Sequence, residues 1–447
     1  MPEQLQVGTS YSQIIKIALP ISMAMLVPQI NFIVNNVFLG HLSENALATA
    51  SITGVYYLIF AGVGFGLNNG LQALISRRAG ENKPHEIGII FNQGVLISLA
   101  IAALGIFLTW FISPLIFRNF IHSKDIAENV IVFLRIRIVG LPFLYVYQMR
   151  NALLVGINKS QLLVLGTFAE AFTNILFDYS LIFGHFGLPQ MGFNGAAVAS
   201  VIAEFSGMFV IFMIITIKGI SKRYSLFRNF NFERRNATRI LKVSGPLIFQ
   251  HAISICSWFF FYILVEHHGK VSLAVSNTMR NIFGFFGVFI WAFASTTNSM
   301  VSNIIGQGRR NDVIRLIIKI MKLSCGLAAV VFILLNLFPG VFLSIYGQGN
   351  DFADAAKPVI RVVALAMMFM SVSSIWLNAV TGTGNSRFTF LIELAAIICY
   401  CFYVYIVLEV KNLSIVWGWM SELLYWFILF SLSFAYIKSK KWYHTII

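Results

Sequence analysis

The chain has 447 residues, of which 58% are hydrophobic and 11% charged, and its mean hydropathy is +0.80. Soluble domains carry about 25% charged residues, so this composition excludes an ordinary water-soluble enzyme or binding domain. The net charge of +15 does not indicate a nucleic-acid partner. The basic residues lie in the short polar gaps between long apolar blocks, where membrane topology accounts for them.

Twelve apolar blocks follow one another along the chain. A helix needs about 20 residues to cross a hydrocarbon layer of ~30 Å. Helices are the predicted structure, because a helix satisfies its own backbone hydrogen bonds in lipid. The predicted spans are 14–39, 46–75, 87–112, 127–156, 161–186, 193–217, 244–266, 272–303, 314–338, 357–382, 388–409 and 413–437.

The lysines and arginines predict the orientation of these spans. If both termini are cytoplasmic, 22 of the basic residues fall on the cytoplasmic side and 6 on the other side. This asymmetry favours cytoplasmic termini. All four cysteines lie within apolar blocks without metal-ligand spacing, which is typical of buried structural thiols.

Three pairs of segments match at one constant offset of 226 residues. They are Pro20 with Pro246, 73–83 with 299–309, and 154–160 with 380–386. The repeat predicts two six-helix bundles of the same orientation, related by a pseudo-twofold axis along the membrane normal and enclosing a central cavity. The predicted parts are an N-terminal lobe 1–217, a basic cytoplasmic linker 218–243, a C-terminal lobe 244–437 and a basic tail 438–447.

The sequence contains no nucleotide-binding loop of the GxxxxGK[ST] kind and no paired filter-like loop. These features favour a secondary transporter over an ATP-driven pump, a channel or an enzyme. We expect no cofactor other than a coupling ion, and a functional monomer, because the twofold repeat lies within one chain.

The segment 34–42, Val-Asn-Asn-Val-Phe-Leu-Gly-His-Leu, resembles the V-D-T-x-F-[VL]-G-[HK]-L segment of the MATE (multidrug and toxic compound extrusion) transporters. The turns 80–83 and 306–309 resemble the family's loops after helices two and eight. The segments 174–184 and 195–200 resemble its fifth and sixth helices. The similarity spans essentially the whole chain.

The resemblance implies export of small amphipathic or cationic organic compounds by alternating access, in exchange for protons or sodium ions. It also implies a cytoplasmic (inner) membrane location in a prokaryote. The wider superfamily includes lipid-linked oligosaccharide flippases. An alternative is therefore a flippase or exporter of an endogenous lipid or secondary metabolite, with atypical or no cation coupling.

The first span departs from the family. The position that normally holds a coupling aspartate is Asn35, which cannot carry a proton but can offer its carbonyl oxygen to sodium. Asn31 lies one turn earlier, so an amide face on this helix is expected to face helix five. Pro20 and Pro28 each remove a backbone hydrogen bond and predict a bend, which is either a gate or a static kink.

The fifth span carries Glu170, Asn174 and Asp178 at i, i+4 and i+8, on one helix face. Carboxylates in a bilayer are costly and indicate a function. We predict a proton or sodium site here, and Asn174 and Asp178 match the family's site positions in this helix. A sodium ion would be held by Asp178, Asn174 and Asn35. The alternative is a structural stripe that pairs with Arg135, Arg137 or Arg150.

Other intramembrane polar residues are candidates for the wall of a substrate cavity. They are Asn68, Asn69 and Gln72 in helix two, His251 in helix seven, Thr297 and Asn298 in helix eight, and Glu393 in helix eleven. His251 could titrate, although a structural role is equally open to it. Glu393 either faces the cavity or pairs with Arg387. Glu204 and Glu422 are predicted to be structural.

Overall fold

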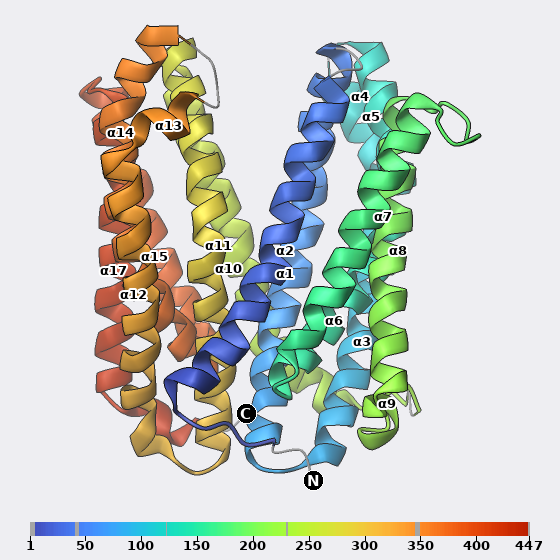
Figure 1. Cartoon of the computed structure of the whole chain (residues 1–447), viewed down its shortest axis with the longest axis vertical. Coiled ribbons are helices and arrows are strands. Elements are labelled where there is room, and N and C mark those ends of the chain that lie inside the picture. Colours follow the sequence, from blue (N-terminus) through green and yellow to red (C-terminus); the bar gives the residue numbers. More distant parts are fainter. Residues whose placement is uncertain (1–4, 41–43, 122, 229–230, 345–348, 446–447) are drawn as a thin grey trace. The chain divides into compact units, whose positions relative to one another are not determined.

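The computed structural model describes the chain except residues 1–4, 41–43, 122, 229–230, 345–348 and 446–447. In the described part the chain is helical, and twelve helices are long and apolar enough to span a membrane. This confirms the prediction of an all-α protein with twelve transmembrane helices (Figure 1). His41 and Leu42, which end the family-like segment in the first span, lie outside the described residues.

The helices follow each other in one series along the chain. Their bounds are α1 Tyr11–Gly40, α2 Glu44–Gly80, α3 Pro84–Phe107, α4 Ser113–Phe120, α5 Lys124–Arg137, α6 Leu141–Gly156, α7 Leu163–Phe183, α8 Phe193–Ile217, α9 Ile220–Arg223, α10 Arg234–Glu266, α11 Lys270–Gly306, α12 Val313–Leu337, α13 Pro339–Ser344, α14 Gly349–Gly382, α15 Ser386–Val404, α16 Ile415–Trp419 and α17 Ser421–Lys438. Single turns of other helix types join several of them.

Two predicted spans are interrupted where proline interferes with the backbone ladder. The span predicted at 87–112 passes through a π-helical turn, Leu108–Ile112, into α4, which carries Pro114 in its first turn. The span predicted at 127–156 is divided into α5 and α6 by a 3₁₀ turn, Ile138–Gly140, just before Pro142. Proline lacks the N–H that an α-helix needs and fits best at a helix start.

The chain forms two compact units whose limits do not follow the halves of the repeat. One unit consists of Met1–Ser22 with Phe249–Ile447, and the other of Met23–Ile248. The chain therefore passes between units inside α1 and again inside α10. The two crossing points are 226 residues apart, which equals the offset of the sequence repeat. The predicted lobes 1–217 and 244–437 assign residues 1–22 and 244–248 differently, because a repeat reports common ancestry and not packing.

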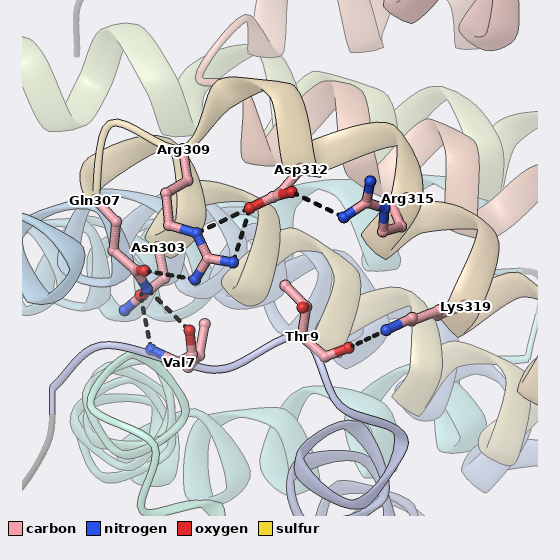
Figure 2. A network of polar contacts seen from close by, with 8 residues as sticks. All are labelled: Val7, Thr9, Asn303, Gln307, Arg309, Asp312, Arg315 and Lys319. Carbon is pink, nitrogen blue, oxygen red and sulfur yellow. Dashed lines mark hydrogen bonds and ion pairs between the residues drawn. The ribbon is translucent and has the colours of Figure 1, made fainter.

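The segment that precedes α1 is bound through its backbone to the unit that contains α11 and α12 (Figure 2). Val7 N–H donates to Asn303 Oδ1 at 3.1 Å, and Asn303 Nδ2 donates to the Leu5 carbonyl at 3.0 Å. Gln307 Nε2 donates to the Val7 carbonyl at 3.0 Å, and Lys319 Nζ donates to the Thr9 carbonyl at 2.9 Å. The side chains of Leu5 and Val7 are buried. We call residues 5–9 the N-terminal strap.

The segment that precedes α10 is held in the same manner by α3 of the other unit. Gln93, which matches Lys319 at the repeat offset, donates from Nε2 to the Asn231 carbonyl at 2.6 Å. The Glu233 N–H donates to Gln93 Oε1 at 3.1 Å, and the Phe227 N–H donates to Asn92 Oδ1 at 2.9 Å. Each repeat thus begins with a strap bound to the unit that the chain is about to leave.

Replacement of Asn303 by alanine is expected to release the N-terminal strap. The change leaves the buried Val7 N–H and Leu5 carbonyl without their amide partner, at a cost of about 1–3 kcal/mol for each group. Hydrogen–deuterium exchange of the Val7 amide should therefore accelerate by tenfold or more. Asn311→Ala is the matched control, because Asn311 accepts only an exposed hydrogen bond from Tyr443. Unchanged exchange in Asn303→Ala would show that burial of Leu5 and Val7 alone holds the strap.

The outer surfaces of many helices carry large apolar side chains in the open. Examples are Phe172 of α7, 70% exposed, and Phe402 of α15, 67% exposed. A soluble protein rarely shows this over long stretches, whereas lipid contact requires it. Inside each unit the helices pack closely, with α7 beside α8 in one unit and α15 beside α17 in the other.

An exposed ion pair joins the turn between α10 and α11 to the end of the α15 span. His267 Nδ1 lies 2.9 Å from Glu409 Oε2, and this hydrogen bond, together with the carboxylate charge, raises the pKa of His267 above its ordinary value of 6.5. A raised folded-state pKa means that the stabilisation is complete below pH 6.5 and is lost as the pH rises through the raised pKa.

Replacement of His267 by glutamine is expected to remove this part of the pH dependence. The melting temperature of wild type in detergent should fall slightly relative to that of His267→Gln as the pH rises above 6.5. The effect is small because both side chains are about half exposed. His85→Gln serves as the control for the loss of a histidine elsewhere, and parallel pH profiles of wild type and His267→Gln would contradict the prediction.

Candidate functional site

The three polar residues of α7 lie on one inward face of that helix. Asp178 is completely buried and Asn174 is 3% exposed, whereas Glu170 is half-buried. Leu176 and Phe172, on other faces of the same helix, are exposed. Since α7 is otherwise apolar, this stripe is its polar contact with the rest of its unit.

The amides of α1 meet this stripe. Asn31 Nδ2 donates to Asn174 Oδ1, and Asn35 Nδ2 donates to the same oxygen at 3.3 Å. The predicted contact between an amide face on the first helix and the polar face of the fifth is therefore present. All three asparagines belong to one compact unit, Met23–Ile248.

Several buried oxygens in this cluster accept no hydrogen bond from any described residue. They are both carboxyl oxygens of Asp178 and the side-chain oxygens of Asn31 and Asn35. Asp178 lies one turn beyond Asn174 on the same helix face. An unpaired carboxylate in an apolar interior is very costly. A proton on Asp178, or a small cation held by these oxygens, would remove that cost.

The three arginines of the neighbouring span do not pair with the α7 carboxylates in the described structure. Arg137 forms an ion pair with Glu204 of α8 at 2.6 Å. Arg150 donates to the Met208 carbonyl, and Arg135 donates to the Trp110 carbonyl at 3.2 Å. The alternative of a structural stripe paired with these arginines is therefore wrong for this arrangement.

The second unit also holds a buried carboxylate, and its surroundings differ. Glu393 of α15 is 3% exposed and accepts hydrogen bonds from the Tyr425 hydroxyl, from Ser254 Oγ at 2.8 Å and from Gln250 Nε2 at 3.3 Å. The described contacts do not include the predicted pairing with Arg387. Glu393 is satisfied by neutral donors, whereas Asp178 has none.

The remaining candidates lie in separate places. Gln72 is buried in α2 beside the half-buried Asn68 and Asn69, while Thr297 and Asn298 are fully buried in α11 of the other unit. Thr297 donates to the carbonyl of Phe293 within its own helix at 2.8 Å. His251 is half-buried on α10 and is not without a partner. Their role in a cavity wall stays a prediction.

The two prolines of α1 lie on either side of the point where the chain changes unit. Pro20 belongs to the unit Met1–Ser22 with Phe249–Ile447, and Pro28 to Met23–Ile248. Pro246 lies inside α10, two residues before the second crossing point. The predicted bend of the first helix stays a prediction, but the crossing points and the prolines share one repeat register.

Comparisons with known proteins agree with this architecture. The family model MatE matches residues 20–180 and, 226 residues later, 246–406. A probable multidrug resistance protein NorM of Thermotoga maritima is 23% identical over 391 residues, which cover 84% of this chain and 80% of that protein.

Two solved structures share the fold. A transporter of the MOP superfamily from Pyrococcus furiosus, described as having a binding pocket of reverse polarity, superposes with a TM-score of 0.89 at 16% identity, over 98% of each chain. An outward-facing multidrug resistance MATE transporter superposes equally well, with a TM-score of 0.89, 16% identity and 98% coverage of both chains. The repeated match over most of the sequence shows that this chain belongs to the MatE family of multi-pass membrane transporters, not to an enzyme family.

Proposed function

We propose that this transporter exports small amphipathic or cationic organic compounds by alternating access, in exchange for protons or sodium ions that bind at Asp178. One observation carries the proposal: Asp178 is completely buried, and neither of its carboxyl oxygens has a partner among the described residues. A buried carboxylate that is neither paired nor hydrogen-bonded is poised to take up a cation.

The cluster supports a division of roles. Asp178 carries the exchangeable charge, because it is the acidic member that is both fully buried and unpartnered. Asn31 and Asn35 hold Asn174 through their amide N–H groups and leave their own oxygens available. Amide oxygens cannot titrate but can complete the shell of a sodium ion around Asp178. Glu170, two turns away, is a second charge on the same face.

Loading and release of the cation would alternate the charge of the site. With a proton or sodium ion bound, Asp178 is neutralised and can stay in dry surroundings. Without it, the carboxylate must reach water or a cationic substrate, because a bare charge in an apolar interior is unstable. Exchange of a coupling ion for an organic cation at one carboxylate follows from this competition.

A second candidate function rests on Asn35. This residue occupies the position of the family's coupling aspartate, so the first helix offers no titratable group of its own at that point. Export or flipping of an endogenous lipid or secondary metabolite, with atypical or no cation coupling, is the alternative that this change favours. The names of relatives such as the Thermotoga maritima protein favour drug export.

The remaining features of the proposal concern placement. The distribution of basic residues favours cytoplasmic termini in the inner membrane. The repeat within one chain favours a functional monomer.

Proteoliposomes test the proposed function. The purified protein is reconstituted, and movement of the amphipathic cation tetraphenylphosphonium is followed under a proton gradient or a sodium gradient imposed separately. Movement against its own gradient in response to either ion is the expected result, with protein-free liposomes as control. Movement that ignores both ion gradients would favour uncoupled export of another compound class.

A further inference from the structure

A buried ion pair lies beside the candidate coupling site and is not part of it. The Arg137 guanidinium donates twice to Glu204, from Nη1 to Oε2 at 2.9 Å and from Nη2 to Oε1 at 2.6 Å. The Tyr57 hydroxyl donates to Glu204 Oε1 at 2.9 Å, and Arg137 stacks 3.7 Å above the Tyr57 ring. Three helices, α2, α5 and α8, thus meet at this pair. We call Arg137, Glu204 and Tyr57 the arginine clamp.

The clamp saturates the carboxylate of Glu204. Both oxygens are engaged by Arg137, and one receives a third donor from Tyr57. Glu204 is 5% exposed and the Arg137 side chain 14%. Burial of such a pair gives little net stability, because desolvation offsets the attraction. Stability alone is therefore a weak reason for placing this pair in a membrane.

The α7 carboxylates are within the electrostatic reach of the clamp. Glu170 packs against α8 at Gly207, one turn after Glu204: the Cβ of Glu170 is 3.0 Å from the position that a Cβ on Gly207 would take. Arg137 acts electrostatically on both Glu170 and Asp178. It is the cationic side chain that would neutralise them if it were free.

The other charged or titratable groups near these carboxylates are already committed. Tyr147 of α6 acts electrostatically on Glu170, and its hydroxyl lies 2.8 Å from Thr167 Oγ1. Arg150 of α6 donates to the Met208 carbonyl of α8. The outcome for the α7 carboxylates therefore depends on where Arg137 is bound.

We propose that Glu204 is a positioning residue that holds Arg137 away from Glu170 and Asp178, so that these carboxylates stay available to the coupling cation. The proposal rests on the proposed function of Asp178. An arginine that paired with Asp178 would compete with the proton or sodium ion as a permanent internal cation. Glu204 prevents this competition by offering Arg137 a two-pronged partner of its own, and Tyr57 fixes the geometry.

The test compares Glu204→Gln with the charge-balanced double variant Arg137→Met/Glu204→Gln in proteoliposomes. In Glu204→Gln, the concentration of coupling cation, proton or sodium, that gives half-maximal export should rise by tenfold or more. In the double variant it should return to within about threefold of wild type. Glu422→Gln is the matched control, because Glu422 is equally buried, also 5% exposed, and is bonded to Trp426 in the other unit.

A purely structural role for the clamp gives a different pattern. In that case Glu204→Gln lowers the melting temperature, but the molecules that remain folded need the same cation concentration as wild type. Export is therefore expressed per folded protein, measured by size-exclusion chromatography. If Glu204→Gln does not fold, the double variant alone decides: a folded double variant that needs tenfold more cation than wild type overturns the proposal.

Failure of this inference is distinguishable from failure of the proposed function. If Asp178→Asn keeps ion-driven export, the coupling role of Asp178 is wrong and the clamp has nothing to protect. If Asp178→Asn abolishes ion-driven export, but Glu204→Gln leaves the half-maximal cation concentration unchanged, the site stands and the positioning role of Glu204 is wrong.

Discussion

Replacement of Asp178 by asparagine is expected to abolish ion-driven export, with a fall of at least 100-fold in the initial rate. The amide has nearly the shape of the carboxylate but cannot bind a proton or carry the charge that holds a cation. Because neither oxygen of Asp178 has a partner among the described residues, the change breaks no described hydrogen bond. The folded structure should therefore persist, and the loss should appear in transport alone.

The measurement is export of tetraphenylphosphonium in proteoliposomes under proton and sodium gradients. Glu393→Gln is the matched control, because it neutralises an equally buried carboxylate that is already satisfied by Tyr425, Ser254 and Gln250. Its ion-driven rate should stay within about fivefold of wild type. A loss in Glu393→Gln with full activity in Asp178→Asn would move the coupling site to the other unit.

Replacement of Gly140 by alanine is expected to destabilise the protein by about 3 kcal/mol, the lower end of the cost of breaking a buried ion pair. The added Cβ would lie 2.2 Å from Glu204 Oε2 and 3.0 Å from Arg137 Nη1. A free side-chain end could move aside, but this carboxylate is held by Arg137 and Tyr57. The methyl group can therefore be accommodated only if the arginine clamp opens.

The melting temperature of the purified protein in detergent measures this effect. Gly54→Ala is the matched control in the same unit, because no atom lies within 4 Å of the added Cβ. A glycine-to-alanine change inside a helix should even stabilise it by roughly 0.5–1 kcal/mol. In the Arg137→Met/Glu204→Gln background the cost of Gly140→Ala should shrink. Equal costs in both backgrounds would locate the clash elsewhere than in the clamp.

The number and type of the spanning elements could be predicted because a bilayer imposes one length and one hydrogen-bonding solution on every span. The α7 stripe could be predicted because helical spacing puts residues i, i+4 and i+8 on one face. The contact of Asn31 and Asn35 with Asn174 was accessible from the same argument applied to two helices. In each case a local rule determines the structure.

The arginine clamp could not be predicted, because its members lie far apart in sequence. Arg137 and Glu204 are 67 positions apart and Tyr57 and Glu204 147 positions apart. The sequence shows three charged residues as candidates for the α7 carboxylates and cannot decide between α7 and α8. Gly140 was a weak signal: a glycine beside a proline reads as a turn, whereas its contact with Glu204 shows that it provides space.

The straps impose an order on biosynthesis. Val7 leaves the ribosome early, but Asn303, which binds it, follows 296 residues later. At a synthesis rate of about 5–20 residues per second, the strap waits roughly 15–60 s for its partner. During that interval the first half of α1 has none of its unit's other helices to pack against, since these begin at Phe249. The membrane insertion machinery must therefore hold this half-helix in place while most of the chain is still unmade, and the first segment synthesised is among the last to fold.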